Sequence, residues 1–351
     1  MFRPVGALIF GQLADRYGRK YPLMAVILLY SIAELSSGFA PNFQVFVILR
    51  AIFGVAMGGE WGLGAALAME TLPTEARGLF SGILQQGYST GYLIVAIFYS
   101  VIIRNFGWRA MFWIGSGLSI PIIILCFFIP ESHSWKNNHS NQKFKGKKWY
   151  IEIKFVLRDH LIRIIHTVLL MACFNFMSHG TQDLYPTFLR DELNFSPQEV
   201  TLTTVVASIG AIIGGTTFGF FSQSWGRRLA IIICASFGFC FLPLYVLPQN
   251  RWLLTFGAFM LYFFVQGAWG IIPAHLNELS PPEFRGTFPG LTYQLGNLIA
   301  ASSAQIEATL GEKFTKNGKP NYGLVQAIFA GCVMRLEYKN ASKFERTCLQ
   351  A

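Results

Sequence analysis

The chain has 351 residues, of which 53% are apolar and only 13% are charged, whereas soluble domains carry about 25% charged residues. This composition excludes a disordered chain and argues against a soluble enzyme. The net charge of +10 lies mainly in loops on one predicted side of a membrane, which is the pattern that orients membrane helices. Nucleic-acid binding is not expected, because no basic stripe is interleaved with aromatic residues that stack on bases.

Apolar runs long enough to cross a hydrocarbon core of ~30 Å dominate the chain. In chain order they cover residues 22–41, 44–66, 79–103, 109–129, 163–187, 199–221, 229–248, 252–274 and 287–310. The sequence therefore predicts an all-α, multi-pass membrane protein in a lipid bilayer.

The two ends of the chain look incomplete as membrane spans. Residues 1–13 are half the length of a span, and residues 322–333 form a short apolar run. The predicted domains are an incomplete N-terminal helix bundle, a cytoplasmic basic linker, an incomplete C-terminal helix bundle and a polar tail, at residues 1–130, 131–162, 163–333 and 334–351.

An internal repeat relates the two halves. Identical residues recur 208 positions apart, at Gly11/Gly219, Gly18/Gly226, Arg19/Arg227, Gly59/Gly267, Trp61/Trp269, Gly62/Gly270, Glu70/Glu278, Pro73/Pro281, Glu75/Glu283, Arg77/Arg285, Gly78/Gly286 and Gln86/Gln294. The repeats have the same orientation, so an even number of helices separates them, as in transporters built from parallel repeats. By this spacing, the helix at 163–187 has no counterpart in the first half. We therefore expect two pseudo-symmetric six-helix bundles from which a first helix, half of a second and most of a twelfth are absent.

The segment from Gly11 to Lys20, with Asp15, Arg16, Gly18 and Arg19, resembles a loop motif of the major facilitator superfamily. The resemblance implies the major facilitator fold and an inner gate, in which the Asp faces the N-terminus of the helix that begins near Thr287. A carboxylate at a helix N-terminus is stabilised by the helix dipole. The second copy has Gln223 and Ser224 where the first has Asp15 and Arg16, so we expect an asymmetric gate. The predicted gate residues are Asp15, Arg16, Gly18, Arg19, Glu70, Arg77, Arg227, Glu278 and Arg285.

A narrower motif lies in the segment Asn175 to Thr187, which resembles the motif of Jen-type monocarboxylate permeases within the sialate:proton symporter group. The resemblance implies uptake of lactate, pyruvate and related short monocarboxylates together with protons. No cofactor is expected, because a proton gradient would drive such transport.

The polar residues of this segment are spaced so that they share one face of a helix. They are Asn175, Ser178, His179, Gln182 and Asp183. Ionisable groups within a membrane are costly and normally face a cavity or a partner, so we interpret this polar arc as part of the substrate path. His179, whose ordinary pKa is ~6.5, is a candidate to carry the coupled proton, with Asp183 holding its tautomer. The alternative is that Asp183 lies at the outer interface and His179 serves helix packing.

Arg50 lies too far into the 44–66 segment for a free surface charge, and its repeat counterpart is Ala258. Because its fork can make two parallel hydrogen bonds, Arg50 is predicted to bind the substrate carboxylate. The alternative is a side chain that extends to the interface. Glu60, whose counterpart is Ala268, is a candidate proton-binding group or the partner of a basic residue on the absent first helix. Glu34 is a further candidate for the same role.

Gln294 and Asn297 are three residues apart on the 287–310 segment and share a face. They resemble family positions associated with substrate handling, and neutral amides suit hydrogen bonding to a carboxylate or hydroxyl. Gln294 matches Gln86 in the repeat, so part of its role is expected to be in the scaffold. No metal-ligand spacing, phosphate-binding loop or nucleophile motif is visible, so neither an enzyme nor a metal site is predicted.

The sequence therefore predicts a secondary transporter in the plasma membrane that couples monocarboxylate uptake to protons by alternating access. The alternatives are a sialic acid:proton symporter and a non-transporting fragment or receptor. The sequence does not fix the oligomeric state, and a monomer is expected.

Overall fold

The computed structural model describes residues 2–132, 134–136, 149–281, 284–316 and 319–348. Its first helices are α1 (Arg3–Tyr17), α2 (Lys20–Gly38), α3 (Phe43–Thr71) and α4 (Arg77–Phe128), with the short 3₁₀ helix η1 (Thr74–Ala76) before α4. The next are α6 (Trp149–Gln182), α7 (Tyr185–Thr187), the π-helical turn η2 (Phe188–Glu192), α8 (Pro197–Trp225) and α9 (Arg227–Val246). The last are α10 (Arg251–Leu279), α11 (Phe288–Ala300), α12 (Ser303–Lys313) and α13 (Tyr322–Cys348), with a two-stranded ribbon of β1 (Thr315–Lys316) and β2 (Lys319–Pro320) before α13.

The predicted all-α membrane fold is confirmed. Within the described residues, seven helices are long and apolar enough to cross a membrane, and they overlap predicted runs. Two predicted boundaries fall where long helices break: Gly107 interrupts α4 with a φ of 75°, and His160 interrupts α6. The break at His160 separates the start of α6 from the apolar run that follows it.

Two segments differ from the prediction. The run at 287–310 is divided at Ala301–Ser302 into α11 and α12, where serines compete with the helix for backbone hydrogen bonds. The helix α13 continues into the region predicted as a polar tail, and it buries Met334 and Glu337. Residues with good helix propensity follow Met334, so the helix extends beyond the apolar run.

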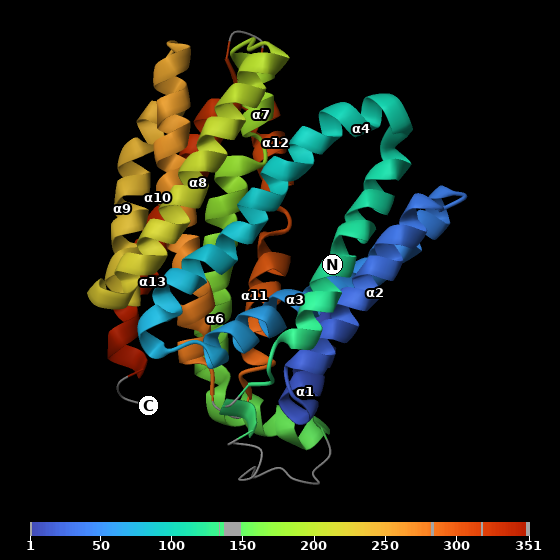
Figure 1. The fold of residues 1–351 in the computed structure, drawn as a ribbon. Helices are drawn as coiled ribbons and strands as arrows, with labels where there is room; N and C mark the ends of the chain where they lie inside the picture. Colours follow the sequence, from blue (N-terminus) through green and yellow to red (C-terminus); the bar gives the residue numbers. More distant parts are fainter. Residues whose placement is uncertain (1, 133, 137–148, 282–283, 317–318, 349–351) are drawn as a thin grey trace. The chain divides into compact units, whose positions relative to one another are not determined.

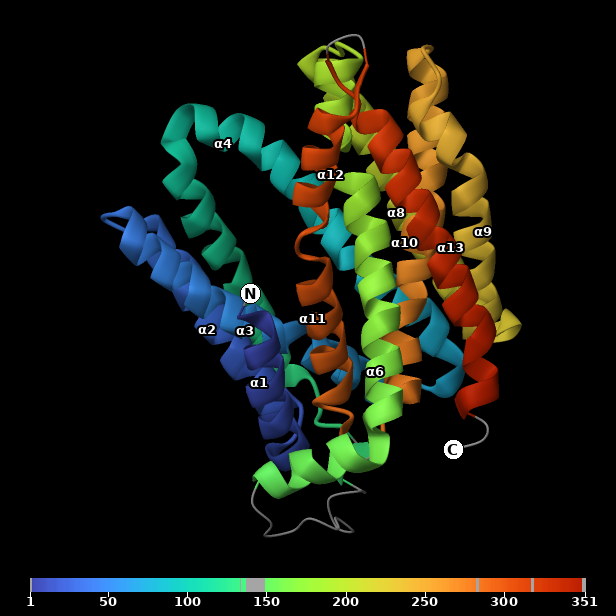
Figure 2. The same cartoon turned by 180° about the vertical axis from the view of Figure 1, so that it is seen from behind.

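Contacts divide the chain into two units that interleave along the sequence. The first unit comprises residues 1–73, 94–168 and 276–298, and the second comprises 74–93, 169–275 and 299–351. In the first unit, α3 packs against both α1 and α2 (Figure 1). In the second, α13 packs against α9 and α12 (Figure 2). The predicted domain boundaries after residues 130, 162 and 333 stay predictions.

Two glycines with positive φ end equivalent helices in the two repeats. Gly18 follows α1 with a φ of 98°, and Gly226 follows α8 with a φ of 88°. Side chains other than glycine rarely adopt this backbone conformation. The 208-residue spacing therefore repeats a backbone turn, and this turn carries the next residue, Arg19 or Arg227, into its contacts.

Candidate functional site

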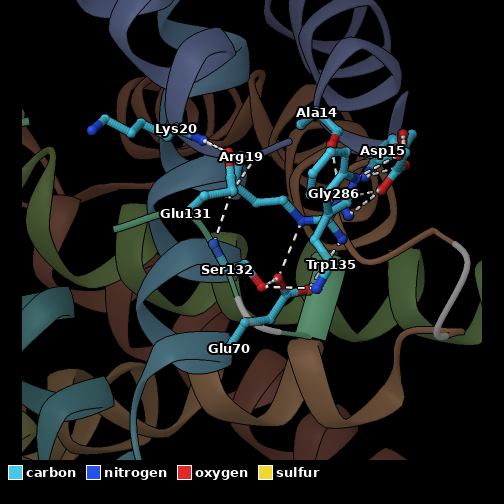
Figure 3. Close-up of polar contacts among 10 residues, drawn as sticks. Ala14, Asp15, Arg19, Lys20, Glu70, Glu131, Ser132, Trp135 and Gly286 are labelled. Carbon is cyan, nitrogen blue, oxygen red and sulfur yellow. Dashed lines mark hydrogen bonds and ion pairs between the residues drawn. The ribbon is translucent and has the colours of Figure 1, made fainter. Parts of the chain in front are cut away.

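Asp15 caps the start of α11 in the first unit. Its Oδ1 accepts a hydrogen bond from the Gly286 backbone N at 2.7 Å, and its Oδ2 accepts bonds from the Thr287 backbone N at 3.1 Å and from Thr287 Oγ1 at 2.7 Å. The first N–H groups of a helix have no partner within the helix, so a carboxylate satisfies them and gains from the dipole. Figure 3 shows Asp15 directed at Gly286.

The charge of Asp15 is set by burial and by these donors. Burial raises the pKa of the Asp15 carboxyl to about 6, while the Arg19 guanidinium and the hydrogen bonds from Thr287 and Gly286 oppose that rise. At pH 7 the carboxyl is therefore mostly ionised and accepts all three hydrogen bonds.

Arg19 joins Asp15 to Glu70 on α3. Its Nε lies 3.2 Å from Glu70 Oε2 and its Nη2 lies 3.1 Å from Glu70 Oε1, while Nη1 lies 3.3 Å from Asp15 Oδ1. The Arg19 and Glu70 side chains are only 3% and 4% exposed. Nη1 also donates to the backbone O of Ala14 at 2.8 Å, and Ser132 Oγ donates to Glu70. A buried, two-pronged pair with additional hydrogen bonds holds one geometry and is costly to break.

The cluster also includes three residues that follow α4 in the chain: Glu131, Ser132 and Trp135 (Figure 3). Glu131 accepts hydrogen bonds from the backbone N of Arg19 at 2.9 Å and from that of Lys20 at 3.1 Å, and Trp135 Nε1 donates to the backbone O of Asp15 at 2.9 Å. The third residue, Ser132, is the one that donates to Glu70. Sequence reasoning placed all three in the linker and missed them, because they have no counterpart in the repeat.

The second unit contains an equivalent cap with different chemistry. Gln223 Oε1 accepts a hydrogen bond from the Gly78 backbone N at 3.2 Å, next to the start of α4. Gln223 and Gly78 are the repeat counterparts of Asp15 and Gly286, so each repeat caps a helix of the other. Arg227 Nη2 donates to Gln223 Oε1 and Nη1 to Ser222 Oγ, both at 2.7 Å. In this cap a neutral amide stands where the first unit has a carboxylate, and an asymmetric gate stays a prediction.

The remaining predicted gate residues are placed as follows. Arg16 is half-buried on α1, Arg77 starts α4 and is half-buried, Glu278 is exposed near the end of α10, and Arg285 is half-buried before α11. The Nε atoms of Arg77 and Arg285 are buried without a hydrogen-bond partner in the described part of the chain. Their roles in a gate stay predictions.

Arg50 lies on α3 and contacts a carboxylate on α2. Its Nη2 is 2.8 Å from Glu34 Oε2 and 2.7 Å from Ser37 Oγ. Aromatic rings surround the guanidinium, whose carbon lies 4.4 Å from the Phe53 ring centroid and 5.0 Å from that of Phe112. Sequence reasoning treated Arg50 and Glu34 separately, and the structure brings them together.

Glu60, also on α3, is half-buried. It makes no hydrogen bond or ion pair with any residue that the structure describes. The neighbouring Trp61 stacks on Tyr293 of α11 at a ring-centroid distance of 4.5 Å.

The polar arc of α6 lies in the second unit. His179 Nδ1 is 3.0 Å from Asp183 Oδ2, and the two side chains are 34% and 41% exposed. Asn175 is buried and donates to the backbone O of Met171 at 2.7 Å. Ser178 and Gln182 are half-buried, and Gln182 Nε2 has no hydrogen-bond partner among the described residues. At this distance the Asp183 carboxylate can accept a hydrogen bond from a protonated His179 Nδ1, which fixes the tautomer of the ring.

On α11, Gln294 is 2% exposed and Asn297 is half-buried. Gln294 Oε1 is buried without a hydrogen-bond partner within the described ranges. The amide can therefore accept one hydrogen bond that these residues do not supply.

Glu307 on α12 is a buried acid that sequence reasoning missed. It is fully buried, and neither carboxylate oxygen has a hydrogen-bond partner in the part of the chain described. A Cβ placed on Gly180 of α6 would lie 2.9 Å from Glu307 Oε1, so the carboxyl rests against the backbone of α6. The signal available in the sequence was that Glu307 is the one acidic residue in the predicted membrane span 287–310.

Comparisons with known proteins agree with this architecture. Residues 4–304 match the family model of the Major Facilitator Superfamily. A Saccharomyces cerevisiae protein described as a carboxylic acid transporter protein homolog is 35% identical, over 94% of this chain and 58% of its own length. The sialic acid transporter NanX of Escherichia coli is 29% identical, over 84% of this chain and 71% of its own length. The chain thus spans less than two thirds of the yeast relative.

The fold also resembles solved structures. The crystal structure of the human organic anion transporter MFSD10 superimposes with a TM-score of 0.79 at 13% sequence identity, covering 97% of this chain and 81% of that one. The family match covers most of the chain, and the fold agrees with it. The chain is a multi-pass membrane protein that belongs to the Major Facilitator Superfamily.

Proposed function

We propose that this chain is a secondary transporter of the plasma membrane that takes up short monocarboxylates, such as lactate or pyruvate, together with protons by alternating access. The observation that carries the proposal is the environment of Arg50. Its guanidinium lies among aromatic rings and already binds a carboxylate, that of Glu34, at 2.8 Å. A site that binds one carboxylate has the chemistry to bind another. The 35% identity to a carboxylic acid transporter homolog supports the same substrate class.

The coupled proton is assigned to the polar arc of α6. His179 and Asp183 form a partly exposed pair in which His179 Nδ1 lies 3.0 Å from Asp183 Oδ2, and histidine is a residue type that carries protons. Glu60 is the other candidate, since it makes no ion pair with the described residues. The other residues predicted to bind substrate are Asn175, Ser178 and Gln182 on α6 and Gln294 and Asn297 on α11, and their side chains can donate or accept hydrogen bonds.

Uptake of labelled lactate, with and without an inward proton gradient, tests the proposal in cells that lack their own carboxylate carrier. We expect gradient-driven uptake, measured on the 351-residue chain and on a version extended to the length of the yeast relative. No uptake by either version, despite confirmed membrane insertion, would contradict the proposed function.

The α6 assignment has its own test. His179→Ala and Asp183→Ala should each lower uptake at least about tenfold, because either change removes the hydrogen-bonded pair that carries the proton. Insertion should persist, since both side chains are partly exposed. Ser208→Ala on α8 is a matched control, because it removes only a bond to the α8 backbone. Wild-type kinetics in both α6 variants would refute the assignment.

Sialic acid is the second candidate substrate, because NanX is a sialic acid transporter and is 29% identical to this chain. Excess unlabelled sialic acid should leave lactate uptake unchanged if the substrate is a short monocarboxylate. Strong competition, together with uptake of labelled sialic acid, would favour the second candidate.

A further inference from the structure

The residues around Arg50 form a polar cluster that only the first repeat contains. Arg50, Glu34 and Ser37 have Ala258, Leu242 and Tyr245 as their repeat counterparts. Ala258 and Leu242 are buried apolar residues. The helical scaffold is therefore built in the second repeat without this ion pair, and its presence in the first repeat needs a reason other than packing.

The contacts of Arg50 leave its hydrogen-bonding fork incomplete. Nη2 has two N–H groups, and its nearest acceptors are Glu34 Oε2 at 2.8 Å and Ser37 Oγ at 2.7 Å, with the Ala33 backbone O at 3.5 Å. The adjacent Nε is buried and has no hydrogen-bond partner among the described residues. A carboxylate that binds Arg50 through two parallel bonds on the Nε edge needs both Nε and Nη2. Such a ligand can complete that edge only if Glu34 or Ser37 gives up its bond.

The aromatic rings restrict how a ligand can approach. The guanidinium carbon lies within 4.4 Å of the Phe53 centroid and 5.0 Å of the Phe112 centroid, and a third ring, that of Phe46, lies at 5.7 Å. Aromatic rings bind the flat face of a guanidinium. A carboxylate must then approach Arg50 at an edge of the guanidinium. Glu34 already occupies part of one edge.

Exposure and charge make an exchange feasible. The Arg50 and Glu34 side chains are 27% and 21% exposed, so neither is sealed in the interior. An unpaired charge within a membrane is costly, and Glu34 neutralises Arg50 when no ligand is bound. An incoming carboxylate supplies the same charge, so Arg50 is paired before and after the exchange, and the displaced Glu34 carboxylate, which is partly exposed, is hydrated instead.

We propose that Glu34 is an internal ligand of Arg50, and that a substrate carboxylate binds by displacing it. This inference rests on the proposed function. Glu34 is a positioning residue, since it acts through Arg50, and it sets the affinity for carboxylates by competing with them. Ser37 holds the same Nη2 without a charge and so provides the matched control.

Arginine-specific labelling with phenylglyoxal tests the proposal on the full chain in membranes, with mass spectrometry resolving each peptide. Arg109 is the internal reference, because its Nη2 donates to a partner other than Glu34, the Ala40 backbone O, at 3.2 Å. Lactate is the probe, and the concentration that halves Arg50 labelling is measured for wild type, Glu34→Gln and Ser37→Ala.

In Glu34→Gln we expect faster labelling of Arg50, and a half-protecting lactate concentration that falls roughly fivefold, as expected for loss of a partly exposed ion pair. The KM for lactate uptake should fall with it. Ser37→Ala should lower both values less than Glu34→Gln does, because a neutral hydroxyl competes less strongly with a carboxylate, and labelling of Arg109 should stay constant. A residue that only stabilised the fold would instead reduce protein levels and raise KM.

Two outcomes would overturn the inference, and they differ in what they say of the proposed function. Protection of wild type and Glu34→Gln at the same lactate concentration would refute displacement and leave the function standing. Absence of lactate protection in both would refute the function and the inference together.

The double variant Glu34→Leu/Arg50→Ala carries the residues of the second repeat. It should insert normally and bind no lactate, whereas failure to insert would show that the pair is structural.

Discussion

At the scale of residues, the cap at the start of α11 depends on one carboxylate, that of Asp15. Asp15 satisfies two backbone N–H groups and one hydroxyl at the start of α11. Its counterpart Gln223 accepts a hydrogen bond from one backbone N–H, that of Gly78. The same turn therefore supports a strong cap in one repeat and a weaker one in the other.

Asp15→Asn should destabilise the folded protein by about 1.5–3 kcal/mol, since hydrogen bonds to a charged acceptor are lost. The amide group also places N–H donors against donors of Gly286 and Thr287. Thermal unfolding in detergent measures the loss. Gln223→Asn, which shortens the neutral cap, should cost less, and an equal loss in both variants would contradict the difference described here.

Arg19 and Glu70 should be strongly coupled, because both are buried and joined by two bonds. A double-mutant cycle with Arg19→Gln and Glu70→Gln should give a coupling free energy of at least ~1 kcal/mol. Additive effects in thermal unfolding would show that each residue acts through other partners.

At the scale of elements, glycines set how closely helices approach. A Cβ on Gly62 of α3 would lie 2.5 Å from the Gly290 Cα of α11, whereas one on Gly64 would have no atom within 4 Å. Small residues at such crossings let backbones meet in membrane proteins. Gly62 and Gly64 are only two positions apart on α3, yet Gly62 lies against the backbone of α11 and Gly64 lies in open space.

Gly62→Ala should therefore destabilise the packing of α3 on α11, at a cost of about 1–3 kcal/mol for overpacking. Gly64→Ala should be neutral or slightly stabilising, because alanine favours a helix. Melting temperatures of the two variants, measured side by side, check this. A similar fall in both would mean that glycine at these positions serves flexibility and not close approach.

The elements were largely predictable from the sequence because membrane spans are long apolar runs. The repeat also indicated which turns are equivalent, and the resemblance implied that Asp15 faces the helix near Thr287. The partners of Arg19 and Arg50 were not predictable: Glu131 is 112 residues from Arg19, and Glu34 lies on another helix and has an apolar repeat counterpart, Leu242. Local patterns carry no information on such pairings, and nor did they indicate the break between α11 and α12.

At the scale of the whole molecule, the two contact units do not follow the two halves of the sequence. The first unit includes residues 276–298, and the second includes residues 74–93. The first half of the chain therefore lacks residues 276–298, which complete the first unit, and the second half lacks residues 74–93, which complete the second unit.

Splitting the chain tests this interleaving. Residues 1–136 and 149–351 expressed separately should accumulate poorly, because buried segments lose their partners, and co-expression should restore both, as judged by immunoblots of membrane fractions. A second fragment carrying Gly290→Leu, which blocks the approach to Gly62, should restore the first fragment less well. Full accumulation of either fragment alone would contradict the expectation.

The interleaving also has a consequence for the order of events during synthesis. A ribosome that adds about 5–20 residues per second needs roughly 10–45 s to proceed from residue 73 to residue 298. During this interval Arg19 and Glu70 can already pair, but Asp15 has none of its three donors from residues 286 and 287. Until α11 is synthesised and completes the first unit, the Asp15 carboxylate of the nascent chain must therefore be hydrated by water or shielded by the translocation machinery.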